Sequence, residues 1–404
     1  MSHPLRTLPA APGGERTVLA ALAAALDGTG PPIAPLRPST QGPSSLEARH
    51  DHVPDDVVLA VTTSGSTASP RTVLLTRGAL EASALATARR LGGSAHQLDD
   101  PAQWLLALPV HHIAGLQVLA RSALAGSDPV ILDLADAFTG EAFAAATARL
   151  TGPRRCTALV PTQLRRVLAS PAGTEALASF DAVLVGGAAT DLGQVRTARA
   201  AGANLVRTYG MTETSGGCVY DGRPLDGVTV ELDEDGRVLL AGPVLAAGYL
   251  ADPELTNRTF VTRAGERWLR TDDLGTFDDD GALRVLGRVD DVINTGGVKV
   301  APAAVEAALS ELDALAQACV VGVPDPEWGS AVIAVVVLAL DASSPSLDAV
   351  REHVALSLGA PAAPRRIVVV DELPELGPGK LDRRAVQRIA AAAVSDPATG
   401  TLRR

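Results

Sequence analysis

The chain has 404 residues, of which 47% are hydrophobic, so it can bury large cores, and its length corresponds to about two to three domains. Its net charge of -11, from 35 basic and 46 acidic side chains, argues against a nucleic-acid-binding protein, which would carry a basic stripe. No apolar run approaches the ~20 residues of a membrane-spanning helix, and the first residues lack a signal-peptide pattern. The cysteines Cys156, Cys218 and Cys319 fit no disulfide or metal pattern. A cytoplasmic protein without membrane insertion is the simplest expectation.

Segments with strand and helix character alternate along the first half of the chain. After a region rich in alanine, proline and glycine, which contains one expected helix at 18–26, strands are expected at 57–62, 104–108, 129–134, 157–161, 182–187 and 204–210. Alanine-rich helices separate them. This alternation is typical of βαβ units and a mostly parallel sheet. In such sheets, ligands bind beyond the carboxyl ends of the strands.

The pattern changes twice further along the chain. Residues 222–287 contain short strand-like segments and turns, which indicates a β-rich antiparallel subdomain. After Asp291, helix-like and strand-like segments indicate a compact α+β module. The sequence thus predicts an α/β fold with a large amino-terminal domain (1–289) and a small carboxyl-terminal domain (290–404), joined by a hinge.

A loop rich in hydroxyl groups follows the strand expected at 57–62. In TTSGSTASPR (62–71), hydroxyls and backbone N–H groups surround Gly65, where the missing Cβ permits close approach to a ligand. Such a loop can bind an anion, although an ordinary turn between two strands would also account for it. The Walker pattern, with its lysine followed by a hydroxyl residue, does not occur in the chain.

Six stretches, in order, resemble the motifs of the adenylate-forming superfamily, which includes acyl- and aryl-CoA ligases, luciferases and peptide-synthetase adenylation domains. They are the hydroxyl loop, LPVHHIAG (108–115), VLVGGAA (183–189), TYGMTET (208–214), RTDDLG (270–275) with GRVDDVINTGGVKV (287–300), and LPELGPGKLDRR (373–384). Each stretch alone is weak, whereas the ordered set is specific. The only two lysines of the chain, Lys299 and Lys380, both fall within it. The resemblance implies an AMP-forming acid–thiol ligase that uses ATP, Mg²⁺ and coenzyme A, and whose first step forms an acyl-adenylate and pyrophosphate.

The resemblance also assigns residues to ATP. The phosphates are expected at Thr63, Ser64, Gly65, Ser66, Thr67 and Arg71. The adenine and ribose are expected at Gly186, Gly187, Ala188, Thr208, Tyr209, Gly210, Met211, Thr212, Asp273 and Arg288. Glu213 is the expected Mg²⁺ ligand because a hard cation prefers carboxylate oxygen. For Glu213 and Asp273, a solvated glutamate and an acidic turn are the plain alternatives.

The expected catalytic residues are Lys380, His112 and Glu213. The ammonium of Lys380 is expected to neutralise charge near the α-phosphate in the first step only. Asp290 is the expected hinge about which the small domain turns, so that Gly296, Gly297 and Lys299 face coenzyme A in the second step. For His112, the wall of the acid pocket is expected, and a core histidine remains the alternative.

The short chain, together with LVPTQLRRVL (159–168) and GGCVYDGRPLDGV (216–228), is most similar to the o-succinylbenzoate–CoA ligases of menaquinone synthesis. The small-molecule acid is therefore expected to carry a second carboxylate, for which Arg207 is the candidate partner because a carboxylate favours a cation. The expected acid pocket comprises His112, Val160, Gln163, Arg207, Ser215 and Gly216.

Two departures from the family pattern leave alternatives open. Ala68 stands where the family usually has glycine, and Arg71 where it usually has lysine. The alternatives are a CoA ligase for another aryl or fatty acid, and a nucleotide-binding homologue without catalytic activity. Monomer and homodimer both remain open.

Overall fold

The computed structural model describes residues 2–37, 52–63, 71–92, 102–377 and 380–395. By its internal contacts, the chain divides into two compact units. The first comprises Met1–Gly187, Thr197–Glu231 and Leu239–Thr271, and the second comprises Ala188–Arg196, Leu232–Val238 and Asp272–Arg404. The mixed α/β fold is confirmed, whereas the boundary at residue 290 stays a prediction.

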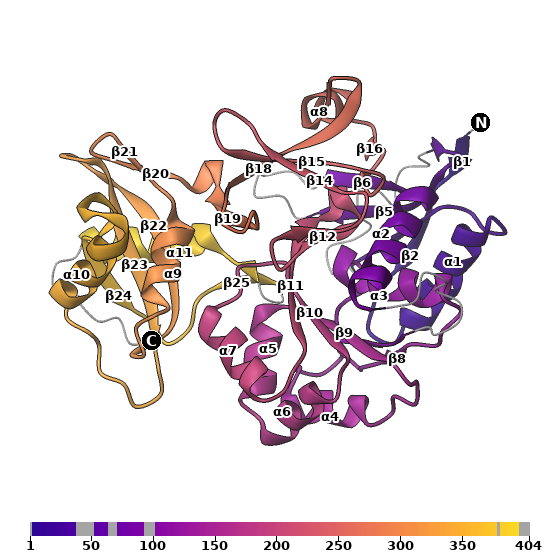
Figure 1. Ribbon diagram of the computed structural model, residues 1–404, viewed down its shortest axis with the longest axis horizontal. Coiled ribbons are helices and arrows are strands. Elements are labelled where there is room, and N and C mark those ends of the chain that lie inside the picture. The colour runs from indigo at the N-terminus through magenta and orange to yellow at the C-terminus, as the bar shows by residue number, and fades with distance from the viewer. Residues whose placement is uncertain (1, 38–51, 64–70, 93–101, 378–379, 396–404) are drawn as a thin grey trace. The chain divides into compact units, whose positions relative to one another are not determined.

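The largest sheet has the strand order β13-β12-β11-β10-β9-β7-β8. Figure 1 labels β8, β9, β10, β11 and β12 of this sheet. Its strands are β7 (Gln103–Leu106), β8 (Val130–Ile131), β9 (Arg155–Leu159), β10 (Ala182–Val185), β11 (Leu205–Met211), β12 (Gly216–Tyr220) and β13 (Arg223–Pro224). The five strands from β8 to β11 are parallel, as predicted, whereas β12 and β13 are antiparallel. Because β10 and β11 are parallel neighbours, their carboxyl ends meet at one edge of the sheet.

Helices separate the strands in the first half of the chain. They are α1 (Glu15–Asp27), α2 (Arg77–Arg90), α3 (Ile113–Leu124), α4 (Gly140–Thr147), α5 (Pro161–Leu168), α6 (Pro171–Ala178) and α7 (Leu192–Ala200). The hydroxyls of Thr76, Thr139 and Ser170 accept hydrogen bonds from backbone N–H groups in the first turns of α2, α4 and α6. A hydroxyl at this position satisfies a donor that the helix itself leaves unpaired.

The strand before the hydroxyl loop lies in a second sheet, not in the parallel one. This sheet has the order β16-β6-β5-β3-β2, with β2 (Arg6–Pro9), β3 (Ile33–Leu36), β5 (Val57–Thr63), β6 (Arg71–Thr76) and β16 (Gly248–Tyr249). Strands β5 and β6 are antiparallel, so the loop connects a hairpin. The assignment of residues 57–62 to a βαβ unit was wrong. The sequence of a buried strand predicts that a strand forms, but not which other strand it pairs with.

The first residues contain strands that the sequence did not predict. Besides β2 and β3, strand β1 (Ser2–Pro4) pairs with β4 (His52–Pro54). Prolines in IAPL and RTLP weaken the strand signal because proline cannot donate to a ladder. Ile33 and Ala34 are nevertheless buried, and this burial stabilises a strand that the proline would otherwise disfavour.

The expected β-rich region consists mainly of strands, with one helix. It contains β14 (Thr229–Leu232), β15 (Arg237–Ala241), β17 (Phe260–Arg263), β18 (Glu266–Phe277), β19 (Leu283–Arg288) and helix α8 (Pro253–Thr259). Strand β18 pairs antiparallel with β17 and with β19. The division between the two units falls within β15 and β18.

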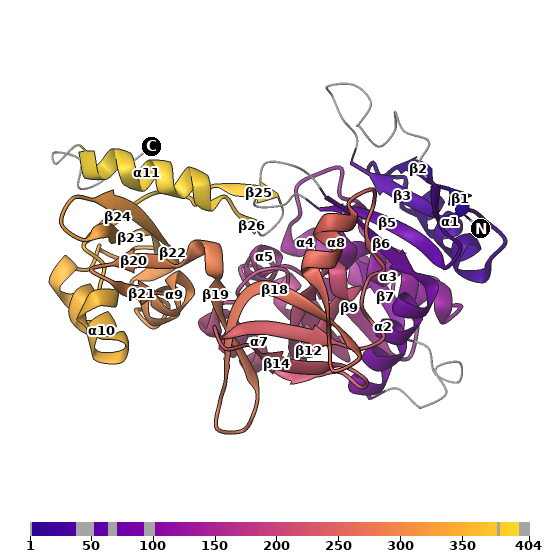
Figure 2. The ribbon, with the colours of Figure 1, turned by 90° about the horizontal axis from the view of Figure 1, so that it is seen from above.

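The last part of the second unit is a three-stranded sheet with helices on both faces. Its elements are β22 (Leu315–Asp325), β23 (Gly329–Leu338), β24 (Arg366–Val369), α9 (Pro302–Leu309), α10 (Leu347–Leu358) and α11 (Arg383–Ser395), with the hairpins β20 (Ile293–Thr295)/β21 (Val298–Val300) and β25 (Glu375–Gly377)/β26 (Lys380–Leu381). Figure 2 shows α11 on one face and α9 and α10 on the other. Alternate residues of β23 enter two separate cores, Val332 and Ala334 in one and Ile333 and Val335 in the other. Burial on both faces explains why this strand is apolar from residue 331 to residue 338.

In the parts of the chain that the structure describes, no helix combines the length and the apolar character needed to cross a bilayer.

Candidate active site

The ends of the hydroxyl loop are held together by the β5–β6 hairpin. Thr63 and Arg71 are register partners, and the Thr63 hydroxyl lies 3.4 Å from the Arg71 carbonyl oxygen, to which it donates. The hydroxyls of Thr62 and Thr72 are 3.2 Å apart. Ser64, Gly65, Ser66, Thr67 and Ala68 lie outside the described residues. Their contacts with phosphate stay predictions, and the structure describes only the two strand ends from which they extend.

Glu213 lies in the short 3₁₀ helix η1 (Thr212–Thr214), directly after β11. The Tyr249 hydroxyl donates a hydrogen bond of 2.8 Å to its Oε1 atom. The backbone N–H of Ala246 donates to the Glu213 carbonyl oxygen at 2.8 Å. Burial and the negative charge of Glu213 raise the pKa of Tyr249, so the hydroxyl keeps its proton. One oxygen of the predicted Mg²⁺ ligand is therefore fixed by a neutral donor.

The residues expected around adenine meet at the carboxyl ends of β10 and β11. A Cβ atom at Gly186 would lie 2.2 Å from the Thr208 hydroxyl, and one at Gly210 would lie 2.2 Å from the Gly216 carbonyl oxygen. The two glycines therefore permit backbone approaches that no other residue allows. Gly187 and Ala188 follow β10 as exposed residues. Along β11, Thr208, Tyr209 and Met211 are half-buried, while Thr212 is buried at the turn that follows.

In the second unit, the two residues expected at the ribose lie side by side. Asp273 of β18 and Arg288 of β19 are register partners, and their charged groups are 3.7 Å apart. The Arg288 guanidinium also lies 3.3 Å from Asp272 and 3.2 Å from Asp290. Burial acts to lower the pKa of Arg288, but the three carboxylates outweigh it and raise that pKa. Arg288 thus holds the predicted hinge residue, Asp290, which lies in the 3₁₀ helix η2 (Val289–Asp291).

The doubled glycine expected to face coenzyme A forms the turn of the β20–β21 hairpin. Gly296 and Gly297 have φ angles of 57° and 80°, the left-handed pair that a two-residue hairpin turn requires. A Cβ atom at Gly296 would also lie 2.6 Å from the Trp328 ring. Lys299 is exposed on β21. Lys380 begins β26, where its backbone pairs with Gly377.

Several residues expected in the acid pocket have buried structural contacts. Gln163 is 4% exposed, and its amide accepts from the Val160 N–H at 3.2 Å and donates to the Ala107 carbonyl oxygen at 2.7 Å. Ser215 is fully buried, and its hydroxyl donates to the Val244 carbonyl oxygen at 2.9 Å. These polar groups fix backbone turns. Contacts of Gln163, Ser215, Val160 or Gly216 with an acid stay predictions.

Two family models match the chain, that of the AMP-binding enzyme over residues 16–272 and that of the AMP-binding enzyme C-terminal domain over residues 304–380. The chain belongs to the AMP-binding enzyme family. The predicted membership of the adenylate-forming superfamily is thereby confirmed, and the protein is an AMP-forming acid–thiol ligase.

Curated relatives of this AMP-binding enzyme include ligases for different acids. A Mycobacterium tuberculosis protein described as "Probable 2-succinylbenzoate--CoA ligase" is 45% identical over 383 residues, which cover 93% of this chain and 96% of the relative. A medium/long-chain-fatty-acid–CoA ligase of the same species is 33% identical over 372 residues, which cover 83% of this chain and 62% of the relative.

Solved structures of o-succinylbenzoate CoA synthetase from Bacillus subtilis are similar to this AMP-binding enzyme. The complex with the acyl-adenylate intermediate has a TM-score of 0.68 at 27% identity and covers 83% of this chain and 70% of the other. The complex with ATP and magnesium ion has a TM-score of 0.67 at 28% identity and covers 82% and 70%.

A buried network missed by the sequence analysis supports the turn after Glu213. Gln117 of α3 and Ser83 of α2 both donate to the Ser215 carbonyl oxygen. Ser215 has a φ of 53°, which is unusual for a residue with a side chain. These contacts join helices to a turn more than 90 residues away in sequence, so no local pattern could have revealed them.

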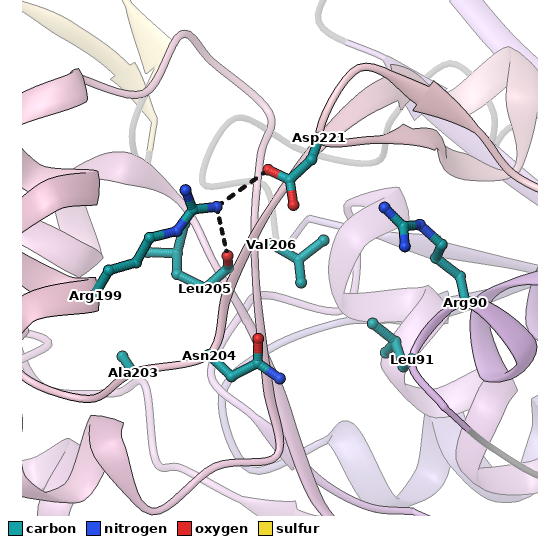
Figure 3. Close-up of a pocket in the computed structure, with 8 residues that line it drawn as sticks. All are labelled: Arg90, Leu91, Arg199, Ala203, Asn204, Leu205, Val206 and Asp221. Carbon is teal, nitrogen blue, oxygen red and sulfur yellow. Dashed lines mark hydrogen bonds and ion pairs between the residues drawn. The ribbon is translucent and has the colours of Figure 1, made fainter. Parts of the chain in front are cut away.

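Arg207 is exposed and forms an ion pair. Its Nε atom lies 3.2 Å from Asp221, which also lies 3.5 Å from Arg199. Asp221 borders a cavity of about 430 Å³ (Figure 3), lined by Arg90, Leu91, Arg199, Ala203, Asn204, Leu205, Val206 and Asp221. This cavity lies beside the amino end of β11, opposite to the end that bears Tyr209. The contact of Arg207 with a second substrate carboxylate stays a prediction.

His112 precedes α3 and is exposed, whereas His111 is half-buried, and their ring centroids are 4.2 Å apart. Burial, with smaller contributions from His112 and Arg37, lowers the pKa of His111 from 6.5 to about 4. The His111 imidazole is therefore neutral at neutral pH. Within the described part of the chain, no group of three His, Cys, Asp or Glu side chains could hold a metal ion.

The lowered pKa of His111 predicts a pH-dependent component of stability. As the pH falls from about 6.5 toward about 4, the unfolded residue takes up a proton that the folded residue resists, so the free energy of unfolding should decrease. His111→Gln should lack this component. Urea unfolding of both proteins at pH 7 and pH 5 measures it: the stability of the wild type relative to the variant should fall at pH 5. An unchanged difference would contradict the prediction.

Proposed function

We propose that this AMP-binding enzyme is an o-succinylbenzoate–CoA ligase that acts in menaquinone synthesis in the cytoplasm. The 45% identity to a protein described as such a ligase, over 93% of this chain and 96% of the relative, is the observation that carries the proposal. The reaction has two steps. A carboxylate oxygen of the acid attacks the α-phosphorus of ATP, the bond to the bridging oxygen of the β-phosphate breaks, and pyrophosphate leaves. The coenzyme A thiol loses its proton and attacks the acyl carbon, and AMP leaves.

In the first step, positive charge and hydrogen-bond donors lower the barrier because negative charge gathers around phosphorus. We assign Thr63 and Arg71, together with Ser64, Gly65, Ser66 and Thr67, to the β- and γ-phosphates. Lys380 is assigned to the α-phosphate and the acid carboxylate. Tyr209 is assigned to adenine, and the adjacent pair of Asp273 and Arg288 to the ribose.

The Glu213 carboxylate fits a magnesium ion. It is half-buried, and its Oε1 atom receives a hydrogen bond from Tyr249, which leaves Oε2 for a hard cation. When bound, Mg²⁺ supplies positive charge to the phosphate oxygens of ATP. A similar Bacillus subtilis enzyme has been solved with ATP and a magnesium ion, which supports Mg²⁺ as the cation that accompanies ATP.

In the second step, we assign the hairpin turn at Gly296 and Gly297, with Lys299, to coenzyme A. Glycines in a turn let an extended ligand pass close to the backbone. Asp290 is assigned to the hinge about which the small domain turns between the first and the second step. The acid pocket is assigned to His112, Val160, Gln163, Arg207, Ser215 and Gly216.

An acid panel tests the proposed substrate. With labelled pyrophosphate, exchange into ATP should be fastest with o-succinylbenzoate and slower with benzoate or a medium-chain fatty acid at equal concentration. o-Succinylbenzoate with ATP should also raise the melting temperature, since a ligand that binds only the folded state stabilises it.

The panel also separates the alternatives. Fastest exchange with a fatty acid would favour a fatty acid–CoA ligase, as for the relative at 33% identity. Binding of ATP without exchange for any acid would favour an inactive homologue.

A further inference from the structure

The assignments above give Tyr249 no role of its own, although its hydroxyl contacts the predicted Mg²⁺ ligand. The side chain is 6% exposed and lies on β16. Its ring packs against Phe260, with centroids 6.0 Å apart, and its hydroxyl donates to Glu213 Oε1 at 2.8 Å. The hydroxyl therefore reaches the carboxylate from a rigid, buried position.

The backbone around Tyr249 connects Glu213 to the strand that begins at Arg71. The N–H of Ala246 donates to the Glu213 carbonyl oxygen at 2.8 Å. The N–H groups of Ala247 and Leu250 donate to carbonyl oxygens of β6, each at 2.8 Å. Segment 246–250 is thus hydrogen-bonded to η1 and to β6. A shift of this segment would move the carboxylate relative to the base of the phosphate loop.

Arg267 fixes the same segment from another side. Its guanidinium donates to the carbonyl oxygens of Ala246 and Ala247 at 2.7 and 2.9 Å, and it lies over the Phe260 ring at 4.1 Å. Two parallel hydrogen bonds from one planar group define the position of two consecutive peptides. Tyr249 and Arg267 thereby restrain both the side chain and the backbone of Glu213.

We propose that Tyr249 is a positioning residue for the divalent cation that accompanies ATP: its hydroxyl fixes one oxygen of Glu213 so that the other faces the cation. The inference rests on the assignment of Mg²⁺ to Glu213. A hydrogen bond to a carboxylate favours the ionised form and one orientation of the group, and both increase the affinity of the remaining oxygen for a cation. Tyr249 itself does not touch ATP in this proposal.

Tyr249→Phe removes the hydroxyl and keeps the buried ring. Calorimetric titration of ATP at a series of Mg²⁺ concentrations should show that the variant needs about tenfold more Mg²⁺ for half-maximal binding, because a hydrogen bond to a charged group has been lost. ATP binding in EDTA should be unchanged. An unaltered Mg²⁺ dependence, or an equal loss with and without Mg²⁺, would overturn the proposal.

Tyr220→Phe is the matched control. Tyr220 is also buried, and its hydroxyl lies 3.0 Å from the hydroxyl of Thr87 instead of contacting Glu213. Its loss should not alter the Mg²⁺ dependence. In a Glu213→Gln background, Tyr249→Phe should have no further effect, because the hydroxyl acts through the carboxylate. Additive effects of the two changes would contradict that route.

Two further outcomes are distinguishable. If Tyr249→Phe does not fold, Arg267→Lys carries the test, since it loses the paired hydrogen bonds to Ala246 and Ala247: a higher Mg²⁺ requirement supports the proposal and an unchanged one overturns it. The calorimetric titration of ATP requires no acid substrate. It therefore tests the role of Tyr249 even if the proposed acid is wrong. A wild type that binds no ATP would instead refute the proposed function.

Discussion

Lys380→Ala is expected to slow adenylate formation by about 10²- to 10³-fold, the scale of one lost transition-state donor. Thioester formation from supplied acyl-adenylate should remain close to that of the wild type, because the ammonium is assigned to the first step only. Pyrophosphate exchange measures the first step, and release of AMP from synthetic acyl-adenylate with coenzyme A measures the second.

The control for this prediction is the other lysine of the chain. Lys299→Ala should slow the second step more than the first. If Lys380→Ala reduced the rates of both steps equally, the assignment of Lys380 to the first step alone would be wrong.

The fold around Lys380 should tolerate the substitution. Arg383, at the start of α11, forms two hydrogen bonds of 2.8 and 2.9 Å to the Glu306 carboxylate and a third to the Val320 carbonyl oxygen. These partly buried contacts anchor the chain just after β26 to α9 and β22. A loss of activity without a change in melting temperature is therefore expected for Lys380→Ala.

Gly210→Ala is expected to lower the stability of the first unit by about 3 kcal/mol, the upper part of the range for an overpacked core. The added Cβ would lie 2.2 Å from the Gly216 carbonyl oxygen and 2.8 Å from the Gly217 Cα atom. These are backbone atoms of the paired strand β12, so they can yield only if the strands separate. Thermal unfolding should begin on the order of 10 °C lower, given a few degrees per kcal/mol.

Gly78→Ala serves as the comparison. Gly78 lies in the first turn of α2, and a Cβ atom there would have no neighbour within 4 Å. Alanine should be neutral or slightly stabilising at that position, because it favours a helix over the unfolded chain. Equal melting temperatures for Gly210→Ala and Gly78→Ala would contradict the close approach of β11 and β12.

The sequence predicted those features that depend on local periodicity. Strands were expected at 182–187 and 204–210, and the structure has β10 at Ala182–Val185 and β11 at Leu205–Met211. Resemblance then supplied roles for residues whose chemistry alone is ambiguous. From its local sequence alone, Asp273 would be interpreted as an acidic residue of a turn. The structure places it next to Arg288, the other residue expected at the ribose.

Features that depend on contacts distant in sequence could not be predicted. Tyr249 and Glu213 are 36 positions apart, and nothing in GY at 248–249 indicates a partner in η1. Gln163 and Ser215 were expected at the acid from the resemblance, and that expectation stays a prediction. Their hydrogen bonds to backbone groups show that buried polar side chains also serve turns.

The most direct test of the proposed chemistry follows an oxygen atom. o-Succinylbenzoate labelled with ¹⁸O in its carboxylates, incubated with ATP, Mg²⁺, coenzyme A and the enzyme, should transfer one labelled oxygen to the phosphate of AMP. Mass spectrometry should find that label in AMP and none in pyrophosphate. Unlabelled AMP, or label in orthophosphate released with ADP, would contradict formation of an acyl-adenylate.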